Sequence, residues 1–246
     1  MARGRLPVEG PIAAGVLPIE NLVNGTVREV YDLLLEHGLV IVGEVVVPVH
    51  LCLAALPGQS LDRIERVYSH IQALGQAEAF LRTRPWSLLT TYNTAGSAKL
   101  IVDRGESGAA AVVSPRAADL FGLEVLADGI QSVPQNRTRF LVVARPGATA
   151  ALSGAPRTPQ PMRTTLVLGV RNEPGSLHRC LAIFARAGLN MSKLESRPSR
   201  DRAWEYVFWV DLDADVADPA TAAALAELGR ATAFVRVLGC YPRSAD

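Results

Sequence analysis

The stretch after residue 162 carries the pattern that most restricts the fold. Its apolar residues recur in some segments with the period of a strand and in others with the period of a helix. The segments follow the order strand, helix, strand, strand, helix, strand, and they cover residues 163–170, 175–188, 189–198, 204–213, 218–230 and 232–242. This order predicts a ferredoxin-like βαββαβ unit, in which two helices pack on one face of a four-stranded antiparallel sheet.

Upstream, strand-like and helix-like runs alternate. The strand-like runs cover residues 12–20, 39–56, 87–92, 108–114 and 123–130, and the helix-like runs cover 27–38, 69–83, 94–105 and 115–122. The first strand is expected to stop at Pro18, and Ser69 is expected to cap the helix over 69–83. The alternation predicts βαβ units around a mainly parallel sheet, so the fold class is α/β.

A segment without apolar periodicity separates these two parts. Residues 145–162 include four prolines and several alanines, a composition typical of a linker. We therefore expect a first domain over 1–146, a linker over 147–162 and a second domain over 163–246.

Composition and charge exclude several classes of function. The chain has 25 Lys and Arg against 24 Asp and Glu, a formal net charge of +1. This near balance gives no general attraction to nucleic acid or to anionic membranes. No apolar run is long enough to span a bilayer. Cys52, Cys180 and Cys240 are odd in number and widely spaced, which suits free thiols in the cytoplasm. The four histidines show no metal-ligand spacing with them, and no nucleotide-binding glycine motif is present, so neither a metal nor a cofactor is expected.

A polar cluster directly precedes a strand-like run near the end of the first part. The sequence "QNRTRF", residues 135–140, leads into apolar residues that end at Val143. Such a cluster is either a solvated turn or the lip of an anion-binding cleft, and the residue pattern leaves both open.

Short motifs in both parts resemble one protein family. In the second part, "PGSL" and "ESRP" resemble the two motifs that line the phenylalanine site of the ACT domain of prephenate dehydratases. In the first part, "GVLPIEN", "NGTV", "EVVVPVHLCL", "VYSHIQALGQ", "LFGLEVLADGI" and "NRTRFLVV" resemble dehydratase segments in the family's order. The resemblance implies a two-lobed dehydratase domain like a periplasmic binding protein, with lobe 1 at about 1–50 and 138–146 and lobe 2 at about 51–137. An ACT regulatory domain follows.

The resemblance also implies a reaction and a set of residues. Prephenate dehydratases are carbon–oxygen lyases that convert prephenate to phenylpyruvate, with loss of CO2 and water and without a cofactor. The implied catalytic residues are Thr138, Glu20 and Asn21. The implied substrate contacts are Ser69, Gln76, Asn93, Thr94, Asn136 and Arg139. Glu20 and Asn21 are also suited to capping a helix that begins near Asn24, and Ser69 to capping the helix that follows it.

The second part is implied to sense phenylalanine between the ACT domains of two subunits, so a homodimer or homotetramer is expected. The implied contacts are Asn172, Gly175, Ser176, Leu177, Glu195, Ser196, Arg197 and Pro198. Two alternatives stay open: an arogenate dehydratase, and a catalytically impaired relative that only binds phenylalanine.

One departure from the family affects these expectations. Prephenate dehydratases open with a strand and a "GPxGT" turn, and Met1–Pro11 contains no equivalent. The start codon could lie further upstream, a partner chain could supply the segment, or catalysis could have been lost. Retention of Thr138, Asn21, Ser69 and Gln76 argues against the last explanation.

Overall fold

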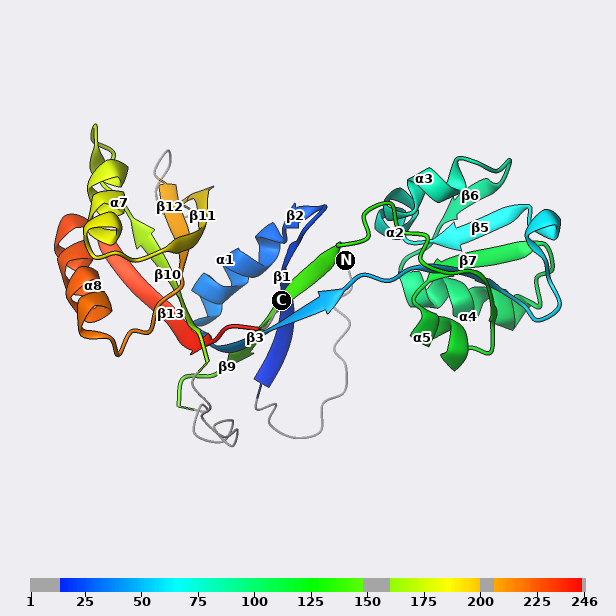
Figure 1. The fold of residues 1–246 in the computed structure, drawn as a ribbon, viewed down its shortest axis with the longest axis horizontal. Coiled ribbons are helices and arrows are strands. Elements are labelled where there is room, and N and C mark those ends of the chain that lie inside the picture. The colour runs from blue at the N-terminus through cyan, green and yellow to red at the C-terminus, as the bar shows by residue number, and fades with distance from the viewer. Residues whose placement is uncertain (1–13, 148–159, 200–205, 245–246) are drawn as a thin grey trace. The chain divides into compact units, whose positions relative to one another are not determined.

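The computed structural model describes residues 14–147, 160–199 and 206–244. The N-terminal segment and most of the expected linker over 147–162 lie outside the described residues. The chain divides into two compact units, shown in Figure 1. Unit 1 comprises Met1–Glu20, Thr26–Val46 and Arg139–Asp246, and unit 2 comprises Asn21–Gly25 and Val47–Thr138. The lobe and domain limits expected from the sequence stay predictions.

Unit 2 is built on a five-stranded sheet in the order β6-β5-β7-β4-β8. Its strands are β4 (Cys52–Ala55), β5 (Arg66–Ser69), β6 (Ser87–Thr90), β7 (Ala109–Val113) and β8 (Glu124–Ala127). Its helices are the 3-10 turn η1 (Leu61–Arg63) and α2 (Ile71–Gln76), α3 (Glu78–Leu81), α4 (Thr94–Arg104) and α5 (Pro115–Leu120). β5 runs parallel to β6 and β7, whereas β4 is antiparallel to both of its neighbours, so the sheet is mixed rather than mainly parallel.

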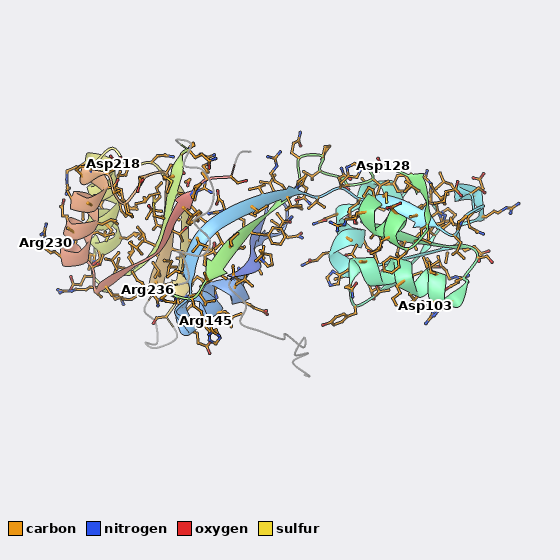
Figure 2. The ribbon with its side chains drawn as sticks, turned by 90° about the horizontal axis from the view of Figure 1, so that it is seen from below. Asp103, Asp128, Arg145, Asp218, Arg230 and Arg236 are labelled. Carbon is orange, nitrogen blue, oxygen red and sulfur yellow. The ribbon has the colours of Figure 1, made fainter. Side chains whose placement is uncertain are left out.

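Apolar layers cover both faces of this sheet. Every residue of β7 is fully buried, as a continuous apolar run in a central strand requires. Alternate residues of β7 belong to different core clusters, with Ala110 and Val112 on one face and Ala111 and Val113 on the other. Charged side chains lie on the outside of the unit, as Figure 2 shows for Asp103, which pairs with Lys99 of α4.

In the first part, one strand was missed and two local predictions were wrong. β5 was not predicted, and Ser69 is its last residue rather than the cap of α2. The cap is His70, whose Nδ1 accepts a hydrogen bond from the backbone N–H of Gln72. β1 (Ala14–Asn21) also continues through Pro18. Its neighbour β2 (Gly25–Thr26) is only two residues long, so part of that edge has no ladder for a proline to interrupt.

Unit 1 contains two sheets. The first has the order β2-β1-β9-β3 and includes β3 (Val40–Pro48) and β9 (Arg137–Ala144). The helix α1 (Arg28–His37) lies between β2 and β3 in the chain and shares a core with this sheet. The second has the order β11-β12-β10-β13, with β10 (Met162–Gly169), β11 (Met191–Pro198), β12 (Tyr206–Leu212) and β13 (Phe234–Pro242). Its three strand pairs are antiparallel, and α7 (Ser176–Arg186) and α8 (Pro219–Ala231) complete the predicted βαββαβ order. The α/β class and the ferredoxin-like unit are therefore confirmed.

The ferredoxin-like sheet is covered on both faces. Leu168 and Val210 share a core with α7 and α8 on one face. Val167 and Trp209 point to the opposite face and share a second core with α1 and β1. There the rings of Tyr31 and Trp209 meet edge to face, with centroids 4.4 Å apart. The sequence placed α1 in a different domain from this sheet, and it gave no sign that the two share a core.

A glycine lies where β13 closely approaches β3. A Cβ on Gly239 would overlap the carbonyl oxygen of Ile41 and lie 2.8 Å from its carbonyl carbon. We expect Gly239→Ala to lower the free energy of unfolding by about 1–3 kcal/mol, as overpacking generally does. Urea unfolding measures this change. Gly75→Ala in α2 is the matched control, because its Cβ would meet open space, and it should be neutral or slightly stabilising. Equal losses in the two variants would contradict the account of this approach.

Candidate active site and amino-acid pocket

Asn21 is the hub of a hydrogen-bond network at the end of β1. Its Oδ1 accepts the backbone N–H groups of Val23 at 3.0 Å and Asn24 at 2.9 Å, which closes a turn and fixes the amide orientation. Its Nδ2 then donates to Oδ1 of Asn136 and to Oγ1 of Thr138, both at 3.0 Å. The structure therefore brings three predicted site residues, Asn21, Asn136 and Thr138, into direct contact.

The network leaves two donors available. Because Oγ1 of Thr138 accepts from Asn21, its own O–H can donate to another group. Asn136 is 1% exposed, and its Nδ2 has no partner among the described residues. A buried donor without a partner costs about 1–3 kcal/mol, so a ligand oxygen placed there would be favourable.

The network lies beyond the end of the unit 2 sheet at which the parallel strands β5 and β7 have their carboxyl ends. β5 and β7 are parallel and end at that edge, where α2 begins directly after β5, as Figure 1 shows. Cys52, the first residue of β4, pairs with Val113, the last residue of β7. The chain before Cys52 therefore extends past the edge, and there the backbone N–H of Val49 donates to the Asn136 carbonyl at 2.8 Å. Ligands of α/β sheets commonly bind outside the carboxyl ends of parallel strands.

Asn93 and Thr94 open α4 at this same edge. Asn93 caps the helix, because its Oδ1 accepts the backbone N–H of Gly96. Asparagine is one of the residue types preferred at this position. Thr94 is the half-buried first residue of the helix. Since α4 follows β6, which is parallel to β5, its positive N-terminal end faces the sheet edge where an anion would sit.

Ser69 and Gln76 are placed differently from each other. Ser69 is fully buried, and its hydroxyl donates to the carbonyl of Val112 at 2.6 Å. Its side chain is thus engaged inside the sheet, which gives no support to a substrate contact. Gln76 ends α2, and its carbonyl accepts the backbone N–H of Ser132, while its side chain is half-buried.

Arg139 joins an ionic network within unit 1 through all three of its guanidinium nitrogens. Its Nε donates to Glu44 at 2.7 Å, its Nη1 to Asp211 at 2.6 Å and its Nη2 to the Tyr241 hydroxyl at 3.0 Å. Burial lowers the pKa of Arg139, but the nearby Asp211, together with Tyr241 and Glu44, raises it above its ordinary value. Each of the three guanidinium nitrogens thus has one partner within unit 1, and the substrate contact of Arg139 stays a prediction.

Glu20 is likewise paired within unit 1. Its Oε2 lies 2.8 Å from Nζ of Lys193 on β11. The family resemblance implied a catalytic role for Glu20. It adjoins Asn21 in the chain, but its carboxylate makes an ion pair with the ferredoxin-like sheet.

A pocket of about 370 Å³ lies at the start of α7. It is lined by four predicted contacts, Asn172, Gly175, Ser176 and Leu177, together with six further residues: Val170, Arg171, Glu173, His178, Tyr206 and Phe208. Gly175 adopts a left-handed conformation with φ of 78°, which brings the chain sharply into the helix. The pocket thus combines aromatic walls with a helix N-terminus, features suited to an apolar amino acid and its carboxylate.

The "ESRP" motif occupies the end of β11, the edge strand of the sheet. Ser196 pairs with Phe208 of the pocket wall, so its side chain lies on the pocket face. Glu195 and Arg197 alternate to the opposite face, where Glu195 accepts from the Thr26 hydroxyl at 2.5 Å. The motif therefore divides, with Ser196 and Pro198 on one face and Glu195 and Arg197 on the other.

Sequence reasoning missed the buried ionic partners Glu44, Arg163, Lys193 and Asp211. Glu44 alone gave a signal, as a single acidic residue within an apolar strand. Among the described residues, no cluster of three or more His, Cys, Asp or Glu is arranged to hold a metal ion. Over the same residues, no helix combines the length and apolarity that crossing a membrane demands.

Comparison with known families decides the membership of the chain. The prephenate dehydratase family model matches residues 7–148, and the ACT domain model matches residues 164–230. The chain belongs to the prephenate dehydratase family.

Individual relatives and solved structures are similar to the chain over most of its length. Arogenate dehydratase 5 of Arabidopsis thaliana, a chloroplastic protein, is 42% identical over 245 residues, covering 92% of this chain and 56% of the relative. The chain thus spans little more than half the length of such curated relatives. A solved prephenate dehydratase of Arthrobacter aurescens in complex with L-Phe is 34% identical, with a TM-score of 0.79 over 94% of this chain and 75% of that one. A quorum-quenching acylase is 32% identical, with a TM-score of 0.82 over 94% and 82%.

Proposed function

We propose that this member of the family is a prephenate dehydratase, which forms phenylpyruvate for phenylalanine biosynthesis and is inhibited by phenylalanine. The observation that carries the proposal is the Asn21–Asn136–Thr138 network. It leaves two donors available for a ligand, the Thr138 hydroxyl and Nδ2 of Asn136, at the end of the sheet where a helix begins. It supplies a hydroxyl for a leaving oxygen and an amide for a substrate oxygen.

The proposed reaction is balanced without an external oxidant or reductant. The bond from the ring to its carboxylate breaks, CO2 leaves, and the electron pair enters the ring. The carbon–oxygen bond on the opposite ring carbon breaks, and hydroxide leaves to become water with one proton from solvent. Formation of the aromatic ring drives both steps, so the protein has to orient the dianion and help the hydroxide depart.

Each unspent donor has a role in this reaction. Thr138 donates its hydroxyl hydrogen to the departing oxygen, while Asn21 holds Oγ1 in position. An aliphatic alcohol is a weak acid, so Thr138 assists through a hydrogen bond rather than by complete proton transfer. Nδ2 of Asn136 and the N-terminus of α4 at Asn93 and Thr94 receive carboxylate oxygens.

The chemistry of these donors favours prephenate over arogenate. Arogenate carries an ammonium group where prephenate carries a ketone, so an arogenate site gains from a nearby free carboxylate. The network residues and the start of α4 are neutral, and the nearest acidic residue in the chain, Glu20, is paired with Lys193. Measuring kcat/KM for both substrates tests the proposal, and a higher value for prephenate is expected. A higher kcat/KM for arogenate would favour the arogenate dehydratase. If neither substrate is turned over, the proposed dehydratase activity is refuted.

Phenylalanine is proposed to bind the pocket at the start of α7, in an assembly of two or four chains. At 100 times its Kd it should stabilise the native protein by about 2.7 kcal/mol. Leu177→Glu should abolish this shift, because a carboxylate in the pocket repels that of the ligand while an acidic residue suits the first turn of a helix. Differential scanning calorimetry measures both effects, with Arg186→Gln at the far end of α7 as control. An unaltered shift in Leu177→Glu would place the site elsewhere.

Phenylalanine binding without turnover of either substrate would instead favour the impaired, purely regulatory relative. The oligomeric state is measured by light scattering with and without phenylalanine. The cytoplasmic location stays a prediction.

A further inference from the structure

The ferredoxin-like sheet binds the two residues that adjoin the network in the chain. Lys193 of β11 pairs with Glu20, which directly precedes Asn21. Asp211 of β12 pairs with Arg139, which directly follows Thr138. The boundary between the two units falls at these same peptide bonds, between residues 20 and 21 and between residues 138 and 139.

These ion pairs are shielded from solvent over most of their atoms. The side chains of Lys193, Asp211 and Arg139 are 12%, 5% and 14% exposed, and only Glu20, at 40%, is more open. Buried charge pairs are screened little by salt, and removing one partner leaves the other uncompensated. The two pairs therefore fix where the residues next to Asn21 and Thr138 lie relative to the sheet.

β11 also holds the far side of the turn that follows Asn21. Glu195 accepts from the Thr26 hydroxyl, so Lys193 and Glu195 bind the residues on either side of the 21–25 turn. Further along the strand, Arg197 pairs with Asp32 at 3.0 Å and donates to the Arg28 carbonyl at 2.6 Å. One face of β11 is thus attached at three points to the segment that carries Asn21.

β11 also neighbours β12, the strand whose residues Tyr206 and Phe208 line the amino-acid pocket. Ser196 pairs with Phe208, which lines the pocket, and it lies between Glu195 and Arg197 in the strand. A shift that a ligand causes at Phe208 therefore reaches its strand partner Ser196, and through the strand backbone it reaches Glu195 and Arg197.

We propose that β11 couples the amino-acid pocket to the Asn21–Thr138 hydrogen bond, with Lys193 and Asp211 as positioning residues. Phenylalanine acts by moving Lys193 and its bound Glu20, which displaces Asn21 from Thr138. A misplacement of about 1 Å at reacting groups lowers rates roughly a hundredfold, so small movements suffice. The inference rests on the proposed dehydratase function and names the route of its regulation.

The test compares Lys193→Met with the exchanged pair Lys193→Glu and Glu20→Lys in the full chain. We expect Lys193→Met to lower kcat for prephenate about tenfold, to leave KM within about twofold, and to weaken inhibition by phenylalanine. Calorimetry should show unchanged phenylalanine affinity, and the exchanged pair should restore part of kcat and of the inhibition. The control is Glu227→Gln, which breaks the exposed Arg186–Glu227 pair between α7 and α8 and should change nothing.

A second readout does not need turnover. Phenylalanine should change amide hydrogen exchange over residues 20–26 in the unaltered chain, and this change should be lost in Lys193→Met. The proposal would be overturned if phenylalanine changed hydrogen exchange over residues 20–26 equally in both proteins. It would also be overturned if Lys193→Met left both kcat and the inhibition by phenylalanine unchanged. An inactive unaltered chain that still shows the exchange response would refute the dehydratase function and leave the coupling standing.

Discussion

Thr138→Ala is expected to lower kcat for prephenate by about 10²–10³-fold, the usual loss when one well-placed donor is removed from a developing negative charge. KM should stay within a few-fold, because Asn136 and the start of α4 are proposed to receive the carboxylates and are unaltered. Product formation is followed directly, since phenylpyruvate absorbs strongly in alkali.

Two further variants separate the hydroxyl from its surroundings. Thr138→Ser keeps an acceptor for Asn21 and a donor for the leaving oxygen, so most of the activity should remain. Thr138→Val keeps the shape without the hydroxyl, and it should resemble Thr138→Ala. Equal activity in the serine and valine variants would show that the hydroxyl does not act on the leaving group.

Arg139→Met is expected to lower the free energy of unfolding by about 3–5 kcal/mol, the usual cost of removing one partner from a buried ion pair. Asp211 would lose its cation in a position where it is 3% exposed. Glu44 would keep Arg163, whose Nη1 lies 2.8 and 2.9 Å from its two oxygens, so the loss falls mainly on Asp211. Urea unfolding followed by tryptophan fluorescence measures the change, because Trp209 reports on the same core.

The comparison variant is Arg186→Met, which removes an exposed pair with Glu227 and should cost no more than about 1 kcal/mol. Arg139→Lys should fall between the two, because one ammonium group cannot reproduce the fork that reaches Glu44, Asp211 and Tyr241. An unchanged stability of Arg139→Met, with a raised KM for prephenate, would instead return this residue to the substrate site.

Local periodicity and short motifs predicted much of the fold. The βαββαβ order of the second part follows from the spacing of its apolar residues alone. α1 ends at Gly38 in a left-handed conformation, and α4 begins at an Asn93 cap, both as expected from the residue types. The grouping of Asn21, Asn136 and Thr138 was predicted through motif resemblance, and the structure adds the hydrogen bonds that join them.

What no local pattern could show depends on contacts between segments that lie far apart in the chain. Arg139 and Ser69 have side chains suited to anion binding, but their partners, Asp211 and Val112, lie far along the chain, and no local pattern names them. β5 was missed because a four-residue strand gives little periodicity, and parallel pairing with β6 and β7 stabilises it. The attachment of β11 to Glu20 and Thr26 also depends on tertiary contacts alone.

The most direct test is a crystal structure with a prephenate analogue whose saturated ring keeps the hydroxyl and both carboxylates but cannot become aromatic. We expect the ring hydroxyl within hydrogen-bond distance of Oγ1 of Thr138, about 2.5–3.0 Å, and a ligand oxygen on Nδ2 of Asn136. A bound analogue whose hydroxyl lies away from Thr138, with Nδ2 of Asn136 still unpaired, would contradict it.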